Sequence, residues 1–196
     1  MNPDWVDGYF SGLRAALDRT EKEIGPDVER LSQWLLEAFR GGHKVLAMGN
    51  GGSASDAQHF AAELVGRFLK ERRGLAAIAL NDNPCCLTAV ANDYGFGQIF
   101  RRQVEALAVA GDVVVGISTS GHSANVLEGL DAARKIGCRT VALLGRGGGE
   151  IAKNVDLAVI VPDDRTPHIQ EMHIAIIHMI CQRVEETLFP AQKPHE

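Results

Sequence analysis

From Lys44 onwards, the sequence alternates between short apolar runs and longer segments in which apolar residues recur at helical spacing. The short runs are nearly continuous in hydrophobic residues, as expected for strands that are covered on both faces. The segments between them, around 53–70, 84–108 and 123–136, have the periodicity of helices. This alternation predicts an α/β fold with a parallel sheet and right-handed crossovers. The predicted strands are KVLAMG (44–49), AAIAL (76–80), DVVVGIS (112–118), RTVALLG (139–145) and DLAVIV (156–161).

Helices are also predicted before the first strand and after the last one. Two amphipathic segments, separated by Gly25-Pro26, fill the first forty residues, and the second of them ends at Gly41-Gly42. A long amphipathic helix is predicted from Pro167 to Leu188. We therefore divide the chain into N-terminal helices that serve packing or oligomerisation within the same domain (1–42), the main α/β domain (43–190) and a frayed tail (191–196).

Composition narrows the class of protein. The chain has 196 residues, of which 45% are hydrophobic and 23% charged, as is typical of one globular domain. A formal charge of −5 argues against a nucleic-acid or anionic-membrane partner, and no apolar segment is long enough to span a bilayer. The four cysteines form no C-x-x-C pair and the N-terminus does not resemble a signal peptide, so we expect a cytoplasmic protein with reduced thiols. The basic cluster Lys70-Glu71-Arg72-Arg73 is expected to complement the dipole at a helix end.

Two loops at strand ends carry the polar residues that a ligand would need. GNGGSA follows the first predicted strand and STSGHS follows the third, and each opens a helix. Ligands of open parallel sheets bind beyond the carboxyl ends of the strands, where the strand order reverses. Glycines allow backbone N–H groups to approach an anion, and hydroxyl groups add further donors. The hydroxyls of Ser118, Thr119, Ser120 and Ser123 therefore suit a phosphomonoester, although such residues also serve as ordinary helix N-caps.

A dinucleotide cofactor is the main alternative ligand for the first loop. Residues 49–54 match the G-x-G-x-x-G/A fingerprint, which also requires an acidic residue roughly 20 positions later at the end of the second strand. Asp82 follows that strand about a dozen residues too late, and Glu71 falls in a helix or the loop after it. We therefore expect neither a nicotinamide nor a flavin. A third glycine loop, GRGGGE (145–150), lacks hydroxyls and is interpreted as a mobile connection or a substrate flap.

Four polar residues on two predicted helices have the types that bind metals. His59 and Glu63 are four residues apart and leave the same face of a helix, as two metal ligands or as a simple ion pair. Gln170 and His178 are eight residues apart, which is about 12 Å of helical rise. Both could reach one metal only by leaning towards each other or by coming from different subunits. The spacing alone does not establish a metal site.

Taken together, these motifs resemble the phosphoheptose isomerase family, bacterial sedoheptulose 7-phosphate isomerases built on the sugar-isomerase (SIS) domain. The resemblance runs from about residue 44 to 189. It implies a flavodoxin-like, five-stranded sheet and a homotetramer with sites between subunits. It also implies one zinc ion per subunit and a sugar-phosphate substrate. The matching segments are GNGGSASDAQHFAAEL, LTAVANDYGF, GDVVVGISTSGHSANV, VALLGRGGGEIA and TPHIQEMHIAIIH.

The resemblance also assigns residues. It implies that His59, Glu63, Gln170 and His178 surround the zinc ion. For the chemistry, Glu63 is the expected base and His178 the expected acid, while His122 receives no role. The expected substrate contacts are Asn50, Gly51, Gly52, Ser53, Glu63, Asn92, Asp93, Ser118, Thr119, Ser120, Ser123 and Gln170.

The expected reaction converts D-sedoheptulose 7-phosphate into D-glycero-D-manno-heptose 7-phosphate through an enediol, which is the first step of nucleotide-activated heptose biosynthesis. The alternative is a SIS module without chemistry, either a sugar-phosphate sensor or a scaffold associated with a replication initiator. A paralogue of the latter kind lacks an acidic residue at the position of Glu63 and a histidine at that of His178. Both residues are present here, which favours the enzyme.

Overall fold

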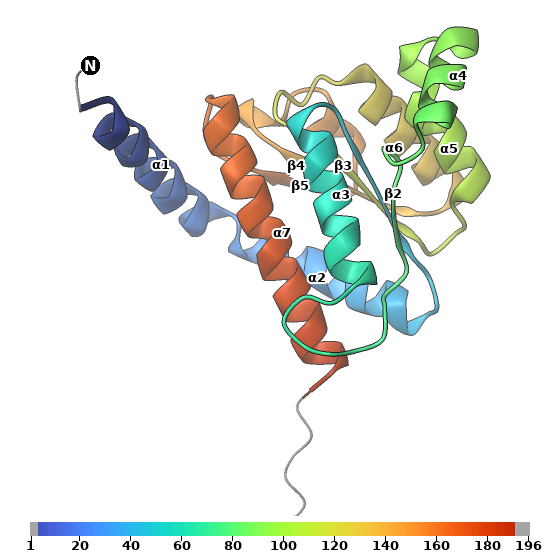
Figure 1. The fold of residues 1–196 in the computed structure, drawn as a ribbon, viewed down its shortest axis with the longest axis horizontal. Helices are drawn as coiled ribbons and strands as arrows, with labels where there is room; N and C mark the ends of the chain where they lie inside the picture. Colours follow the sequence, from blue (N-terminus) through green and yellow to red (C-terminus); the bar gives the residue numbers. More distant parts are fainter. Residues whose placement is uncertain (1–3, 191–196) are drawn as a thin grey trace, which may run out of the picture.

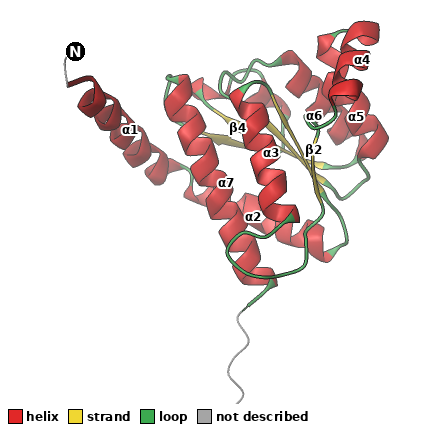
Figure 2. Cartoon of the chain, viewed as in Figure 1, coloured by secondary structure: helices red, strands yellow, loops and turns green. Residues whose placement is uncertain are grey.

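A computed structural model describes residues 4–190 and shows a five-stranded, fully parallel sheet with helices on both faces (Figures 1 and 2). The strand order is β2-β1-β3-β4-β5, which is the flavodoxin-like order. The predicted fold class is thus confirmed, and each strand falls within its predicted run. The tail predicted over 191–196 lies outside the described residues. The strands are β1 (Val45–Gly49), β2 (Ala77–Ala79), β3 (Val113–Ser118), β4 (Arg139–Leu144) and β5 (Leu157–Ile160).

Alternate residues of the central strands feed two separate hydrophobic layers. Val45 and Ala47 of β1 point into the layer built with α2, α3 and α7, whereas Leu46 and Met48 point into the layer built with α5 and α6. All residues of β1 and β3 are buried because helices cover both faces. The helices are α1 (Asp4–Glu23), α2 (Gly25–Arg40), α3 (Gly52–Val65), α4 (Pro84–Tyr94), α5 (Ile99–Leu107), α6 (Ala124–Ile136) and α7 (Thr166–Leu188).

Two of the predicted helices are shorter than the sequence pattern suggested. The segment 84–108 divides into α4, a short 3-10 turn η1 (Phe96–Gln98) and α5, because Gly95 adopts a φ of 89° that ends α4. The segment 53–70 ends at Val65, and the residues after it form a loop against α7. Arg72 in this loop donates to the carbonyl oxygens of Glu63 and Leu64 in the last turn of α3, as expected for a basic residue at a helix end.

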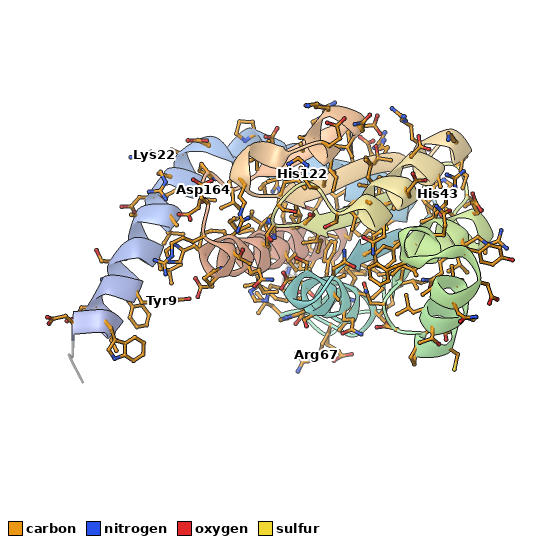
Figure 3. All side chains as sticks on the ribbon, turned by 90° about the horizontal axis from the view of Figure 1, so that it is seen from above. Tyr9, Lys22, His43, Arg67, His122 and Asp164 are labelled. Carbon is orange, nitrogen blue, oxygen red and sulfur yellow. The ribbon has the colours of Figure 1, made fainter. Side chains whose placement is uncertain are left out.

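Helix α1 extends away from the body of the molecule and touches it mainly along α7 (Figure 1). The hydroxyl of Tyr9, labelled in Figure 3, donates to Glu171 of α7. Trp5 and Phe10 of α1 remain largely exposed, at 69% and 49%. None of the helices in residues 4–190 is both long and apolar enough to cross a membrane.

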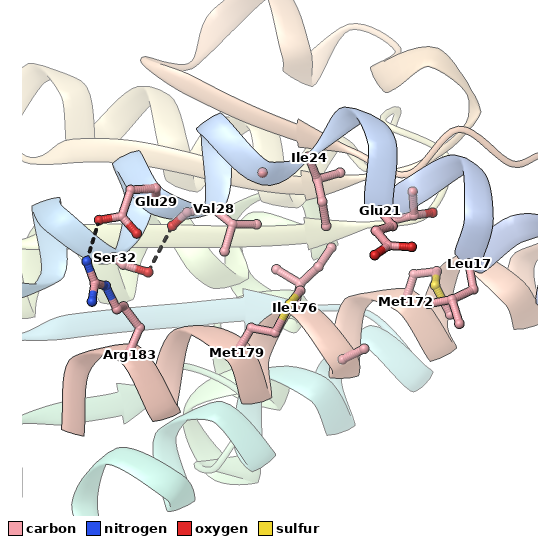
Figure 4. A pocket seen from close by; sticks show the side chains of 13 residues that line it. Leu17, Glu21, Ile24, Val28, Glu29, Ser32, Met172, Ile176, Met179 and Arg183 are labelled. Carbon is pink, nitrogen blue, oxygen red and sulfur yellow. Dashed lines mark hydrogen bonds and ion pairs between the residues drawn. The ribbon is translucent and has the colours of Figure 1, made fainter. Parts of the chain in front are cut away.

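A largely apolar cavity of about 520 Å³ lies between α7 and the α1–α2 hairpin (Figure 4). Val28 of α2 and Met172 and Ile176 of α7 line it, and an ion pair of 2.9 Å between Glu29 and Arg183 closes one end. This cavity contains none of the residues that the sequence predicts for the site. The candidate chemistry therefore lies on another face of α7.

A fully buried carboxylate, that of Asp112, organises the edge of the sheet where the strands begin. Asp112 accepts hydrogen bonds from the backbone N–H groups of Lys44 and Val109 and from the ammonium group of Lys44. These groups fix the starts of β1 and β3 at their common end. Asp112 is thus a structural residue, remote from the carboxyl ends of the strands.

We expect Asp112→Asn to lower the free energy of unfolding by about 1–3 kcal/mol, because one buried N–H group loses its acceptor and the cation its counter-charge. Urea denaturation measures this effect. Asp131→Asn, which removes an exposed ion pair with Lys135, is the matched control and should cost well under 1 kcal/mol. Equal losses in the two variants would contradict the role given to Asp112.

Candidate functional site

The two predicted ligand loops meet at the point where the strand order reverses, between β1 and β3. The loop after β1 (residues 49–54) is here called the glycine loop. The side-chain amide of its Asn50 and that of Asn125, in α6, exchange two hydrogen bonds of 2.9 and 2.8 Å. Asn81 similarly pairs with the backbone N–H and C=O of Gly49. The loops after β1, β2 and β3 are therefore joined into one rim at the carboxyl edge of the sheet.

The glycine loop requires its glycines for conformation and for space. Gly51 has a φ of 57° and precedes α3 as its N-cap residue. A Cβ atom on Gly49 would lie 2.5 Å from the carbonyl oxygen of Ser53, so any larger residue would push the loop away from the helix. The backbone is thus held close to the start of α3, where N–H groups point outward.

The loop after β3 (residues 118–123), here called the serine loop, does not use its last hydroxyl as a helix cap. Ser123 occupies the N-cap position of α6, yet its side chain makes no capping hydrogen bond. Its Oγ instead lies 2.9 Å from the Oγ of Ser118, and the Oγ of Ser120 accepts from the N–H of His122. The N-cap interpretation therefore does not account for Ser123. Its hydroxyl faces the same loop as the other polar groups.

Helices α3 and α7 bring together three of the predicted metal ligands. The Nε2 atom of His59 lies 2.9 Å from Oε1 of Glu63 and 3.4 Å from Nε2 of His178, which is 119 residues later in the chain. The donor atoms of the three residues all lie within 4.8 Å of one another. The side chains of His59 and Glu63 are 40% and 24% exposed, so the cluster is open to solvent and to a ligand.

This His–Glu–His cluster fits a zinc ion. Two imidazole nitrogens and a carboxylate oxygen are a donor set of catalytic zinc sites, which keep a further position open for water or substrate. Two ligands at ordinary zinc–nitrogen distances in a tetrahedral arrangement are about 3.3 Å apart. The two Nε2 atoms are 3.4 Å apart, which matches this spacing.

Comparison with known proteins decides the family. The SIS domain family profile matches residues 8–145. The phosphoheptose isomerase of Geobacter sulfurreducens is 59% identical over 188 residues, which cover 94% of this chain and all of that protein. The chain belongs to the phosphoheptose isomerase family. The phosphoheptose isomerase GmhA from Neisseria gonorrhoeae superposes with a TM-score of 0.89 at 44% identity, covering 93% of this chain and 98% of that one. The phosphoheptose isomerase from Francisella tularensis gives 0.92 at 35% identity, covering 95% and 100%.

Gln170 lies about two helical turns before His178, the predicted metal ligand on the same helix α7. Its side-chain amide packs where a Cβ atom of Gly52 would be, in the glycine loop. Gly52 precedes His59 by seven residues, which is about 10 Å of rise on α3. Within one chain, Gln170 therefore sits beside the predicted substrate loop. Its predicted role as a metal ligand stays a prediction.

Asn92 and Asp93 occupy the last turn of α4, beyond the edge strand β2. The amide of Asn92 donates to the carboxylate of Asp93 at 2.8 Å, and both residues are exposed. Within residues 4–190, their hydrogen bonds do not connect them to the glycine or serine loop. Their contact with substrate stays a prediction of the family resemblance.

The third glycine loop packs against the serine loop. Gly121 has a φ of 68°, and a Cβ atom there would collide with the carbonyl oxygen of Gly148. Ile151, just after the loop, donates its N–H to the carbonyl oxygen of Gly121 at 3.0 Å. The guanidinium of Arg146 bonds the carbonyl of Asp164 and the hydroxyl of Thr166. These contacts favour a support for the serine loop over the mobile connection or flap that we expected.

The sequence did not point to two polar residues of this region, Asn125 and Asp56. Asn125 was missed because its partner Asn50 lies 75 residues away. Asp56, three residues before His59, has a buried Oδ2 atom without a hydrogen-bond partner. Burial raises the pKa of this carboxyl to about 6, against a smaller lowering effect of His59. Its position almost one helical turn before His59 is the only signal in the sequence that could have drawn attention to it.

Alanine substitution at two glycines separates backbone strain from lost loop contact. Gly121 and Gly147 have similar φ values of 68° and 71°, so alanine at either site carries strain of about 1–2 kcal/mol. Only at Gly121 does the new methyl group meet the backbone of the third glycine loop. We expect Gly121→Ala to lose more stability than Gly147→Ala and to weaken binding of inorganic phosphate, as measured by thermal shift and calorimetry. Equal behaviour of the two variants would contradict the packing described.

Proposed function

We propose that this chain isomerises D-sedoheptulose 7-phosphate to D-glycero-D-manno-heptose 7-phosphate, the first step of nucleotide-activated heptose biosynthesis. The observation that carries the proposal is the convergence of His59, Glu63 and His178 from two helices. A carboxylate and an imidazole in one open cluster are the groups that a proton-transfer isomerase needs. The family relationship supports the same conclusion, because relatives at 53–60% identity are phosphoheptose isomerases.

The phosphate group of the substrate is assigned to the serine loop. Ser118, Thr119, Ser120 and Ser123 offer four hydroxyl groups within six residues, at the start of α6. A phosphomonoester presents three acceptor oxygens, and a helix N-terminus favours its negative charge. The glycine loop and Gln170 lie on the neighbouring part of the rim and are assigned to the sugar hydroxyls.

The chemistry requires a proton to leave C1 of the ketose and a proton to arrive at C2. Glu63 is assigned as the base that removes the C1 proton to give the enediol, and its protonated carboxyl then delivers a proton to C2. His178 is assigned as the acid that moves the proton between the two substrate oxygens as the carbonyl passes from C2 to C1. Both side chains belong to the cluster whose donor atoms lie within 4.8 Å of one another, so one substrate can contact both.

His59, Glu63 and His178 would hold the zinc ion, with Gln170 as a further predicted ligand. When bound, a divalent cation supplies Lewis acidity that polarises oxygens of the substrate. Zinc and the homotetramer with sites between subunits are predictions from the family resemblance, and the cytoplasmic location is a prediction from the cysteines and the N-terminal sequence. The exposed apolar residues of α1 are compatible with association between subunits.

A variant without the base tests the reaction directly. Glu63→Gln keeps the size and polarity of the side chain, so it should bind sedoheptulose 7-phosphate while turnover falls by about 10²- to 10⁴-fold. Formation of the aldose is followed by NMR, and Glu105→Gln, at an exposed ion pair on α5, serves as the control with near-normal turnover. Near-normal turnover in Glu63→Gln would refute the role of Glu63. Binding without turnover in the unmodified protein, with every sugar phosphate tried, would favour the sensor or scaffold.

Metal binding is tested separately from turnover. We expect the chelator-treated protein to bind one Co²⁺ per subunit, giving the absorption bands of a low-symmetry site, and to bind Zn²⁺ in competition. His59→Ala removes a ligand and should weaken the affinity for Co²⁺ by at least about tenfold. His43→Ala, beside Asp112 at the edge where the strands begin, should leave the affinity for Co²⁺ unchanged. Equal affinities for Co²⁺ in the unmodified protein, His59→Ala and His43→Ala would show that the metal does not bind at this cluster.

A further inference from the structure

The loop after α3, residues 66–73, is held by one buried carboxylate of α7. Glu185 accepts hydrogen bonds from three consecutive backbone N–H groups, those of Phe68 at 3.1 Å and of Leu69 and Lys70 at 2.8 Å each. Its side chain is only 2% exposed. A buried carboxylate needs such donors, and here all of the backbone donors come from the same short loop.

Arg72 completes this arrangement and extends it to α3. Its Nε donates to Glu185 at 2.9 Å, and its side chain is also 2% exposed. Its other guanidinium N–H groups donate to the carbonyl oxygens of Glu63 at 2.7 Å and of Leu64 at 2.9 Å, in the last turn of α3, and to those of Gly66 and Arg73 in the loop. One guanidinium therefore ties the end of α3 to the end of α7, so the pair is here named the Arg72–Glu185 clamp.

The clamp lies close to the His–Glu–His cluster in both helices. Arg72 binds the backbone of Glu63 itself, and Glu185 follows His178 on α7 by seven residues, which is two helical turns. Helix ends normally fray because their last carbonyl groups lack partners. The clamp satisfies the carbonyl groups of Glu63 and Leu64 in the last turn of α3, so the backbone that carries Glu63 is fixed.

The clamp also fixes an aromatic ring against His178. Phe68 is bound to Glu185 through its backbone N–H, and its ring stacks on the imidazole of His178 with centroids 5.6 Å apart and an interplanar angle of 29°. On another side, His178 meets the ring of His59 edge-on at 5.1 Å. The imidazole is thus enclosed by two rings, which restrict its rotation about the side-chain bonds.

We propose that Phe68 and the Arg72–Glu185 clamp are positioning residues that hold His178 in the orientation needed for metal binding and proton transfer. This inference rests on the proposed function of the His–Glu–His cluster. None of the three residues reaches that cluster with a polar side-chain atom. Their effect passes through the ring of His178 and the backbone of Glu63, as outer residues around a metal site orient its ligands.

Substitution of Phe68 tests the aromatic contact. Phe68→Leu keeps an apolar side chain but removes the stacked ring, whereas Phe68→Tyr keeps the ring. We expect Phe68→Leu to weaken the affinity for Co²⁺ by about 10- to 100-fold and to lower kcat with little change in KM. We expect Phe68→Tyr to retain both the affinity for Co²⁺ and the kcat of the unmodified protein. Phe39→Leu, the same change in the α2 core, controls for lost packing and should reduce stability alone.

Substitution of the carboxylate tests the clamp with Phe68 left in place. Glu185→Gln and Asp112→Asn each neutralise a buried carboxylate that holds backbone N–H groups and a cation, but Asp112 binds Lys44 and Val109 rather than the loop that carries Phe68. Both should lower stability. Only Glu185→Gln should move the imidazole C–H resonances of His178 away from the ring-current shifts of the stacked state, and only Glu185→Gln should weaken Co²⁺ binding.

The result that overturns the inference is a folded Phe68→Leu or Glu185→Gln protein with unchanged His178 resonances and unchanged Co²⁺ affinity. Equal changes in Asp112→Asn would also overturn it, because they would reflect general loss of stability. These readouts need no sugar. A protein that passes them yet fails to isomerise any heptose phosphate would refute the proposed function while the positioning roles stand.

Discussion

The structure depends on the parallel packing of α3 against α7 on one face of the sheet. Each helix follows the carboxyl end of a strand, so both run back along the sheet in the same direction. Three levels of contact fix their register. Gln170 meets Gly52 at the first level, His178 meets His59 at the second, and Glu185 meets the loop after α3 at the third. The steps of seven or eight residues match two helical turns on either helix.

This register explains why some predicted partners meet and others do not. His178 meets His59 and Glu63 because all three occupy the middle level. Gln170 lies two turns earlier on α7 and therefore faces the glycine loop, beside the predicted sugar contacts. The arrangement distributes the functions along the groove between the helices. Substrate loops lie at one end, the cluster in the middle and the Arg72–Glu185 clamp at the other end.

The fold was largely predictable from sequence because the apolar runs of a doubly covered parallel sheet are continuous and the helices between them are periodic. The five strands and both N-terminal helices agree with these patterns, and the strand order agrees with the flavodoxin-like fold that the family resemblance implied. The ends of α3 and α4 were not predictable, because they depend on a buried carboxylate that binds Leu69 from 116 residues away and on the positive φ of Gly95. Of the site, the glycine loop, the serine loop and the i, i+4 pair were visible as local patterns. The Asn50–Asn125 pair and the stacking of Phe68 on His178 arise from tertiary contacts between distant segments.

The central claim is that Glu63 carries the proton in an isomerisation at the His–Glu–His cluster. The most direct measurement is NMR of D-sedoheptulose 7-phosphate incubated with the protein in D₂O. The account predicts that the aldose product carries solvent deuterium at C2, and that Glu63→Gln abolishes both product and deuterium incorporation. Product formation and deuterium incorporation that proceed unchanged in Glu63→Gln would contradict it.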